Sequence, residues 1–313
     1  MNTKYNRFAV CFFDVLGFET KFKKIGLGRM LENYQQLIRV VDERNQRTKD
    51  WFGNLNFSES AYWTSEQEPF ISNKIYGAYA SDSILLFSFA DFPENRYPEA
   101  LNLKENESTV RASNPATGWM YHPIPCDNFL DVCNEIICHS IEIGLPLRGS
   151  LSLGEAVLHL DRGIFLGQPL IDAARLESNQ KCIGVTFSKS FMSQVVPNRY
   201  QLPFNNQFKN PSATFLVSTD LMLDWPRHWR NTRNSNLENF INNLNSIPEY
   251  THYYRTTLET IESSNLRAQK FNSIDEMLIT KVYPQFSNID SLQLKTRLFR
   301  SVDKNGKEEE VKP

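Results

Sequence analysis

Two aspartates at the ends of apolar runs constrain the fold of this chain more than any other feature. Asp14 closes an apolar run that begins at Phe8, and Asp82 stands in a short polar turn between two apolar stretches. An ionised carboxylate at the end of a buried strand is costly unless a cation meets it. Two such carboxylates on neighbouring strands can hold divalent cations, which prefer oxygen ligands and are often shared with substrate phosphates. The pair therefore predicts a metal site.

Each aspartate also has a simpler explanation. Aspartate is common in hairpin turns, where Asp82 is expected, because its side chain accepts hydrogen bonds from nearby backbone N–H groups. Asp14 taken alone could cap the end of a strand. These explanations treat the two residues singly, whereas metal binding accounts for both together.

Hydrophobic patterning predicts the first half of an α+β core. The run around Asp14 is short, continuous and rich in Phe and Val, which is typical of a buried strand, and Gly17 permits a tight turn after it. The next apolar residues recur at helical spacing, and two strands then form a hairpin about Ser81 and Asp82. The expected elements are strands at 7–16, 74–80 and 83–89 and a helix at 28–46. Polar stretches near 50–70 and 91–125 are expected to be surface insertions.

The second half of the core is predicted in the same way. Asp127 is a suitable N-cap for a helix that Gly144 ends, and Pro169 suits the first turn of a later helix. The expected elements are helices at 127–143 and 169–177 and strands at 146–159, 163–166 and 182–187. This order gives the split-βαβ, ferredoxin-like arrangement, a mainly antiparallel sheet with helices on one face.

The rest of the chain carries a weaker signal. We expect residues 1–190 to form the core and residues 191–303 to extend the same domain, with helices at 237–244 and 253–268. The charged residues 304–313 are expected to be a disordered tail.

Composition excludes several classes of protein. The 34 basic and 36 acidic residues leave no basic surplus for a sequence-independent grip on nucleic acid. No apolar run is long enough to span a membrane, and the polar N-terminus does not resemble a signal peptide. The five cysteines lack zinc-like spacing and are expected to be reduced thiols that fill the core. A cytoplasmic location is therefore expected.

Three motifs together resemble a known family. They are Phe-Phe-Asp-Val-Leu-Gly-Phe at 12–18, the strand–turn–strand around Asp82, and the stretch from Gly167 to Glu177. In this order they resemble the class III nucleotide cyclase catalytic domain, and within it the bacterial pyrimidine cyclases of Pycsar antiphage defence. The resemblance covers residues 5 to about 190.

The resemblance implies a role for each matching residue. Asp14 and Asp82 correspond to the paired metal ligands, joined by the backbone carbonyl of Val15, and would hold two Mn²⁺ or Mg²⁺ ions. Backbone N–H groups at Gly17 and Phe18 would wrap the triphosphate. The following residue, Glu19, replaces the small hydroxyl residue that the family often has there.

Two arginines match phosphate-binding positions of the family. Arg148 matches a strand arginine that contacts phosphate, and its forked, permanently charged side chain suits phosphate oxygens. Arg175 matches the transition-state arginine that reaches the other subunit's metals across a homodimer interface. The alternatives are an exposed strand arginine for Arg148 and a helix-surface pair with Asp172 for Arg175.

Departures from the family concern the base and the transition state. Purine-cyclising relatives read the base with a lysine and an acidic residue where this chain has Ala78 and Ile164. Ile171 replaces the asparagine that assists the transition state, although Asp172 lies next to it. Side chains alternate along a strand, so Tyr76 shares a face with Ala78 and could stack on a pyrimidine, or be an ordinary core tyrosine.

These features predict a homodimeric pyrimidine cyclase. It would convert UTP into cyclic UMP and pyrophosphate, and by resemblance a separate effector protein would sense this antiviral messenger. The alternatives are a cytidylate cyclase, a purine cyclase with unfamiliar base contacts, and a catalytically dead module that binds nucleotide. A polymerase-type palm is a weaker alternative, because no GGDEF-like hairpin is present.

Overall fold

A computed structural model describes most of the predicted core. The described residues are 6–54, 75–90, 126–160, 162–192, 196, 198–203, 208–210, 217–244, 248–282, 301–302 and 308–309. The predicted insertion at 91–125, most of the one at 50–70 and most of the charged tail lie outside these residues. The chain divides into two units, Met1–Ser264 and Asn265–Pro313. The second contains the end of the last helix and a two-residue strand pair, β9 (Ser301–Val302) and β10 (Glu308–Glu309).

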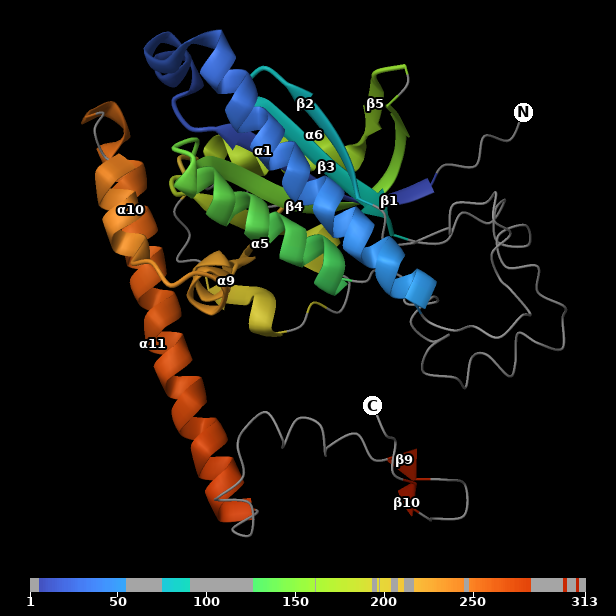
Figure 1. Cartoon of the computed structure of the whole chain (residues 1–313), viewed down its shortest axis with the longest axis vertical. Coiled ribbons are helices and arrows are strands. Elements are labelled where there is room, and N and C mark those ends of the chain that lie inside the picture. The colour runs from blue at the N-terminus through green and yellow to red at the C-terminus, as the bar shows by residue number, and fades with distance from the viewer. Residues whose placement is uncertain are drawn as a thin grey trace, which may run out of the picture. The chain divides into compact units, whose positions relative to one another are not determined.

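The first unit is built on one mixed sheet (Figure 1). Its strand order is β2-β3-β1-β4-β6-β8-β7, and β5 pairs with β4 outside this path. The strands are β1 (Asn6–Val15), β2 (Tyr76–Ala80), β3 (Ser83–Phe89), β4 (Leu147–His159), β5 (Ile164–Gly167), β6 (Gly184–Ser188), β7 (Gln201–Pro203) and β8 (Ser218–Leu223). The only parallel pair in the described sheet is β4 with β6. The order β2-β3-β1-β4 confirms the split-βαβ prediction and places β1 at the centre of the core.

Alternation along β1 gives the sheet two buried faces. Ala9, Cys11 and Phe13 belong to the larger apolar core, under α1 (Phe18–Asn54) and α5 (Cys126–Glu142). Phe8 and Val10 face a smaller core that includes residues of α6 (Gln168–Asn179). Figure 1 shows α1 and α5 in front of the sheet and α6 behind it. Helices therefore cover both faces, and the site described below lies on the α6 face.

Two helix boundaries differ from the predictions. A further helix precedes the one predicted from residue 28: α1 runs from Phe18, but Gly26 has non-helical angles (φ 75°, ψ 171°) and divides it into two helices joined at a kink. The helix α5 begins at Cys126, so the prediction that Asp127 is its N-cap is wrong. Gly144, at φ 81°, ends that helix as expected.

The C-terminal part of the first unit packs on the same core. Its elements are α7 (Lys189–Met192), η1 (Asn198–Tyr200), α9 (Trp225–Thr232), α10 (Leu237–Leu244), η2 (Pro248–Tyr250) and α11 (Thr251–Val282). Trp225 and Trp229 of α9 are fully buried in the larger apolar core, so this extension shares the core of residues 1–190. Four cysteines are free and buried, as predicted. Among the described helices, none has the length and apolarity needed to cross a membrane.

Candidate active site

The fold brings Asp14 and Asp82 to one edge of the sheet. Asp14 lies at the end of β1, opposite Ser83 of β3, and the backbone N–H of Val15 donates to the carbonyl of Asp82 over 2.9 Å. The turn that carries Asp82 is fixed from α1, where the Tyr34 hydroxyl donates to the carbonyl of Ser81 over 2.5 Å. Adjacency of the two aspartates, expected from the strand pattern, follows from this antiparallel register.

A buried arginine lies between two carboxylates. Arg148 of β4 is the register partner of Asp14, and its Nη2 lies 2.7 Å from Asp14 Oδ2 and 2.8 Å from Glu177 Oε1. Its side chain is 11% exposed, so Arg148 is no ordinary surface arginine. Glu177, on α6, was missed as a site residue by the sequence reasoning. Its only signal was its place at the end of the third motif.

Burial disfavours the ionised forms of Asp14 and Glu177, and nearby positive charge offsets this only in part. Burial raises the pKa of Asp14 more than the hydrogen bond and charge of Arg148 lower it. The charge of Asp82 raises that pKa further. Burial likewise raises the pKa of Glu177 to about 7 despite the charge of Arg148. Burial therefore outweighs the charge of the guanidinium that the two acids share, and further positive charge would favour their ionised forms.

The donor set fits a divalent cation only in part. In the regions that the structure describes, no group of three or more acidic, histidine or cysteine side chains is arranged to hold a metal. Two carboxylates and a carbonyl, as at Asp14, Asp82 and Val15, suit an ion such as Mg²⁺, which commonly takes its remaining ligands from water and substrate phosphates. The oxygen chemistry fits such an ion, with incoming phosphates completing its shell.

The predicted phosphate turn follows directly after Asp14. Gly17 has φ +71°, which favours glycine, and a Cβ there would lie 2.9 Å from the Tyr250 ring. Phe18 begins α1 and stacks on Phe22 with ring centroids 5.8 Å apart. Glu19 is exposed and pairs with Lys23 over 2.5 Å, so its departure from the family pattern is a surface feature in this structure.

Helix geometry separates Arg175 from Glu177. Residues two apart on an α-helix point about 200° from each other, and α6 accordingly buries Glu177 while Arg175 is exposed. Asp172 accepts a hydrogen bond from Gln168 over 2.8 Å, and the described side chains show no ion pair between Asp172 and Arg175. The role of Arg175 in a partner's site stays a prediction.

The predicted base-reading positions lie away from the carboxylates. Tyr76 stacks on Phe87 with centroids 5.2 Å apart and, with Ala78, lies against the smaller core. At about 3.3 Å per residue, Tyr76 lies about 13 Å along β2 from Ala80, the last residue before the turn that carries Asp82. Ile164 and Ile171 are exposed, at 38% and 53%.

A second cation near the carboxylates was also missed. The Lys209 ammonium donates to the carbonyl of Ser178 over 2.9 Å, at the end of α6. Its charge favours the ionised forms of Asp14 and Glu177. Lys209 lies in a segment without regular structure, where sequence pattern gives no indication of its neighbours.

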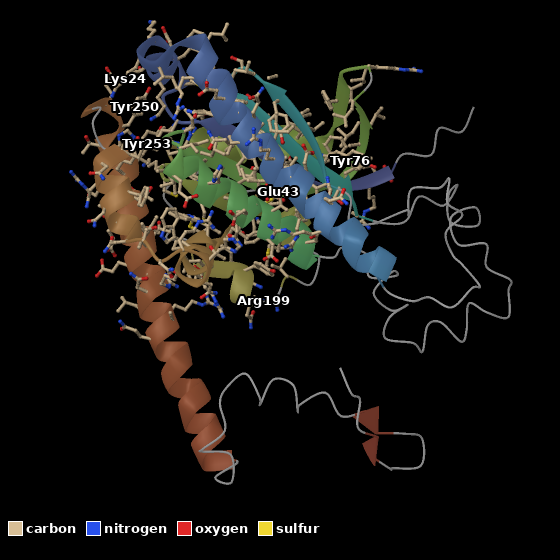
Figure 2. The ribbon with its side chains drawn as sticks, in the orientation of Figure 1. Lys24, Glu43, Tyr76, Arg199, Tyr250 and Tyr253 are labelled. Carbon is tan, nitrogen blue, oxygen red and sulfur yellow. The ribbon has the colours of Figure 1, made fainter. Side chains whose placement is uncertain are left out.

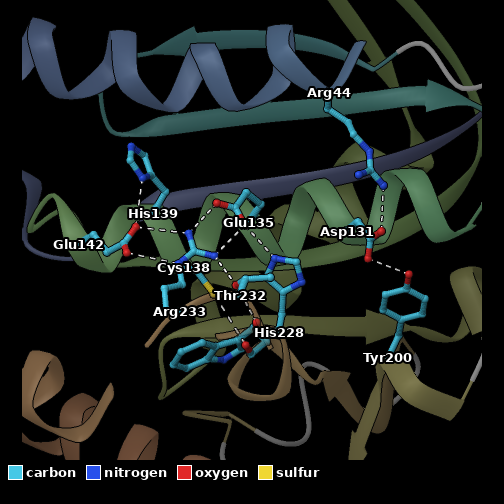
Figure 3. Close-up of polar contacts among 11 residues, drawn as sticks. Arg44, Asp131, Glu135, Cys138, His139, Glu142, Tyr200, His228, Thr232 and Arg233 are labelled. Carbon is cyan, nitrogen blue, oxygen red and sulfur yellow. Dashed lines mark hydrogen bonds and ion pairs between the residues drawn. The ribbon is translucent and has the colours of Figure 1, made fainter. Parts of the chain in front are cut away.

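A different charged network joins α5 to α9 (Figure 3). Arg233 lies 2.5 Å from Glu135 and 3.3 Å from Glu142, and His228 lies 2.8 Å from Glu135. One turn earlier on α5, Asp131 pairs with Arg44 of α1 over 2.8 Å. A cavity of about 520 Å³ adjoins this network, and each acidic residue in its lining is paired with a cation. We interpret the network as structural.

Comparisons with known proteins find similarity to solved structures alone, since no protein family and no curated protein matches the sequence. A guanylyl cyclase domain of the RhoGC fusion protein from Blastocladiella emersonii is 15% identical, with a TM-score of 0.36, over 64% of this chain and 89% of that one. The adenylyl cyclase CyaB from P. aeruginosa is 10% identical, with a TM-score of 0.39, over 71% and 96%. A class III adenylyl cyclase-like ATP-binding protein from Pseudomonas aeruginosa is 12% identical, with a TM-score of 0.33, over 85% and 44%.

Proposed function

We propose that this protein is a nucleotide cyclase, which converts a nucleoside triphosphate into a 3′,5′-cyclic monophosphate and pyrophosphate. One observation carries this proposal. Asp14 at the end of β1 lies beside Asp82 in the β2–β3 turn, and burial raises the pKa of Asp14 despite the neighbouring Arg148. Such a site is stabilised by cations that bring phosphate oxygens with them.

Each site residue would have its own role in the cyclisation reaction. The ribose 3′-oxygen attacks the α-phosphorus and pyrophosphate leaves. Mn²⁺ or Mg²⁺ held by Asp14, Asp82 and the Val15 carbonyl would supply the positive charge that stabilises the phosphate oxygens. Arg148 and the backbone N–H groups of Gly17 and Phe18 would bind and orient the triphosphate.

The proposed enzyme is a homodimer in which Arg175 serves the partner's site. Arg175 lies on the exposed side of α6, opposite Glu177, and so faces away from the carboxylates of its own chain. Exposed apolar side chains on β5 and α6 supply a surface that association would bury: Ile164, Leu166 and Ile171. Arg175 would stabilise negative charge that develops on the phosphates.

The proposed substrate is UTP and the product cyclic UMP. Ala78 and Ile164 have no side-chain group that could hydrogen-bond a purine. The motif resemblance to the Pycsar cyclases supports a pyrimidine and an antiviral messenger that a separate effector senses. CTP is the alternative pyrimidine, because uracil and cytosine differ only at C4 and N3, where donor and acceptor are exchanged.

The direct test is to incubate the purified protein separately with ATP, GTP, CTP and UTP in Mn²⁺, and to identify products by mass. Cyclic UMP with stoichiometric pyrophosphate is the expected result. Cyclic AMP or GMP as the main product would retain the cyclase but overturn the pyrimidine assignment.

A mixing experiment tests the shared site. Asp14→Asn and Arg175→Ala should each be inactive, yet regain activity when mixed, because a mixed dimer contains one complete site. Random exchange makes half of the dimers mixed, so recovery should approach about a quarter of wild-type activity. No recovery despite demonstrated subunit exchange would mean that Arg175 is an ordinary residue of the helix surface with no role in a partner's site.

A nucleotide-binding module without turnover is the second candidate. Two observations favour it: Arg148 is held between two carboxylates, and Ile171 replaces a residue that assists the transition state in the family. Binding of a nucleotide without pyrophosphate release from any of the four would support this candidate over the cyclase.

A further inference from the structure

Three aromatic residues of the C-terminal segment, Tyr250, His252 and Tyr253, lie next to the candidate active site. We call them the aromatic corner. The Tyr253 ring centroid is 6.1 Å from that of Tyr250 and 4.1 Å from that of His252. The Tyr250 ring lies against Gly17 and the Tyr253 hydroxyl contacts Arg148, whereas Figure 2 shows Tyr76 well away from both tyrosines. The corner thus joins the metal and phosphate end of the site, whereas Tyr76 lies elsewhere.

Tyr253 contacts the arginine that lies between the carboxylates. Its hydroxyl accepts a hydrogen bond from Arg148 Nη1 over 3.3 Å, and the guanidinium carbon lies 5.4 Å from the ring centroid. The other terminal nitrogen, Nη2, faces Asp14 and Glu177. Because a guanidinium is planar, contacts at both terminal nitrogens fix the orientation of the whole group.

The same ring also contacts the second cation. The Lys209 ammonium lies 5.4 Å from the centroid of Tyr253, which is within the range of an attractive cation–π contact. Tyr253 is 6% exposed, so little water competes with these contacts. One aromatic ring therefore places two positive groups at the carboxylate cluster.

The backbone that carries Tyr253 is anchored to the sheet. The Thr257 hydroxyl donates to the carbonyl of Tyr253 over 2.7 Å and accepts from the backbone N–H of Ile183 over 3.0 Å. The Tyr250 ring occupies the space that a Cβ of Gly17 would take. The start of α11 is thus fixed against both the phosphate turn and the end of the sheet that carries Arg148.

We propose that Tyr253 is a positioning residue of the phosphate pocket, which orients Arg148 and Lys209 toward the phosphate chain of the substrate. The C-terminal segment is then a part of the catalytic site and no mere appendage of the domain. This inference rests on the proposed function in one respect, that the ligand carries a triphosphate.

The test uses the full-length protein and inorganic tripolyphosphate with Mg²⁺ as the probe, measured by calorimetry. Tyr253→Phe removes the hydroxyl and should weaken binding about fivefold, the value of one modest hydrogen bond. Tyr253→Leu also removes the ring and should weaken binding about thirtyfold. Tyr254→Phe is the matched control, because Tyr254 is a buried neighbour whose hydroxyl has no hydrogen-bond partner among the described residues; it should change binding less than twofold.

A double-mutant cycle distinguishes positioning from general stability. In an Arg148→Lys background, Tyr253→Phe should have little further effect on tripolyphosphate affinity, because the hydroxyl acts through the guanidinium. Additive losses, wild-type affinity in Tyr253→Leu, or no tripolyphosphate binding by the wild type would each overturn the proposal. Melting temperatures monitor folding, and the isosteric Phe variant keeps the test decisive if the Leu variant unfolds.

The same measurements separate this inference from the proposed function. Tripolyphosphate binding that depends on Tyr253 through Arg148, in a protein that cyclises none of the four nucleotides, would support the positioning role and exclude the cyclase. Cyclase activity in Tyr253→Leu with an unchanged KM would support the cyclase and overturn the positioning role.

Discussion

The molecule contains two clusters of acidic and basic side chains that differ in how well their charges are balanced. In the α5–α9 network, burial raises the pKa of Glu135, but hydrogen bonds from His228 and Arg233 outweigh it and lower that pKa to about 2. In the candidate active site, burial outweighs Arg148 and raises the pKa of Glu177 to about 7. Similar residue types are therefore fully paired in one place and underpaired in the other.

This difference separates a structural network from a functional site. A paired network gains nothing from a further cation, whereas underpaired carboxylates are stabilised by one. Perturbed acids in native proteins are more frequent at functional sites, although structural networks perturb pKa values as well. The direction of the shift, upward at Asp14 and Glu177 and downward at Glu135, distinguishes the two clusters here.

The largest expected contrast is in catalysis. Asp14→Asn or Asp82→Asn should lower the rate of pyrophosphate release by about 10³-fold, about 4 kcal/mol in the activation free energy, because each removes a proposed metal ligand. Asp131→Asn, in the paired network, should change the rate less than about threefold. Initial rates in Mn²⁺ with the best nucleotide measure this, and more than a tenth of wild-type activity in Asp14→Asn would contradict the metal assignment.

The next contrast is in stability without metal. Glu135→Gln should lower the free energy of unfolding at pH 8 by about 2 kcal/mol, since it removes the main partner of a half-buried arginine. Glu177→Gln should leave stability unchanged or raise it by about 1 kcal/mol, because it removes an underpaired buried charge. Urea unfolding with a chelator measures both. An equal loss in the two variants would make the Glu177–Arg148 pair a stability element as well.

Local patterning predicted the central strands, the hairpin and the pair of aspartates. Asp14 and Asp82 were accessible to sequence reasoning because each interrupts a simple apolar pattern, and antiparallel pairing of adjacent strands then brings them together. Pattern failed to predict the helix before Gly26, which a kink separates from the predicted one, and it placed the start of α5 after Cys126.

Glu177, Lys209 and Tyr253 were not predicted, for a common physical reason. Each reaches the site through the packing of distant segments: the rotation of α6, an irregular segment after β7, and the start of α11. No local period marks such residues. The predicted role of Arg175 depends on a second chain, and that of Tyr76 on a bound nucleotide, so both stay predictions.

Metal binding should produce a smaller contrast. At ten times its dissociation constant, Mn²⁺ should stabilise the wild type by about 1.4 kcal/mol, or about 3–5 °C in melting temperature. Glu135→Gln should show the same increment from its lower starting point, because its network is remote from the ligands. Asp14→Asn should show none. A metal-induced increment in Asp14→Asn equal to that of wild type would place the ion elsewhere.

The smallest contrast is in the pH dependence of stability, measured by urea unfolding between pH 5 and 8 with a chelator. Glu177 has a pKa of about 7 in the folded protein and 4.5 as its ordinary value, so the folded state binds more protons in that interval and its stability falls as pH rises. Glu177→Gln should remove this penalty. Its free energy of unfolding relative to wild type should therefore rise by about 1 kcal/mol from pH 5 to pH 8. This is less than the full pKa shift implies, because the ionisation of nearby groups adjusts to that of Glu177.

The paired network should show the opposite sign in a different interval. Glu135 has a folded pKa of about 2, below its ordinary 4.5, so its contribution is present above pH 4.5 and is lost as pH falls toward 2. The deficit of Glu135→Gln relative to wild type should therefore shrink as pH falls from 4.5 toward 2. A flat difference for Glu177→Gln between pH 5 and 8 would mean that Arg148 compensates Glu177 fully, and the distinction between the two clusters would then rest on Asp14 alone.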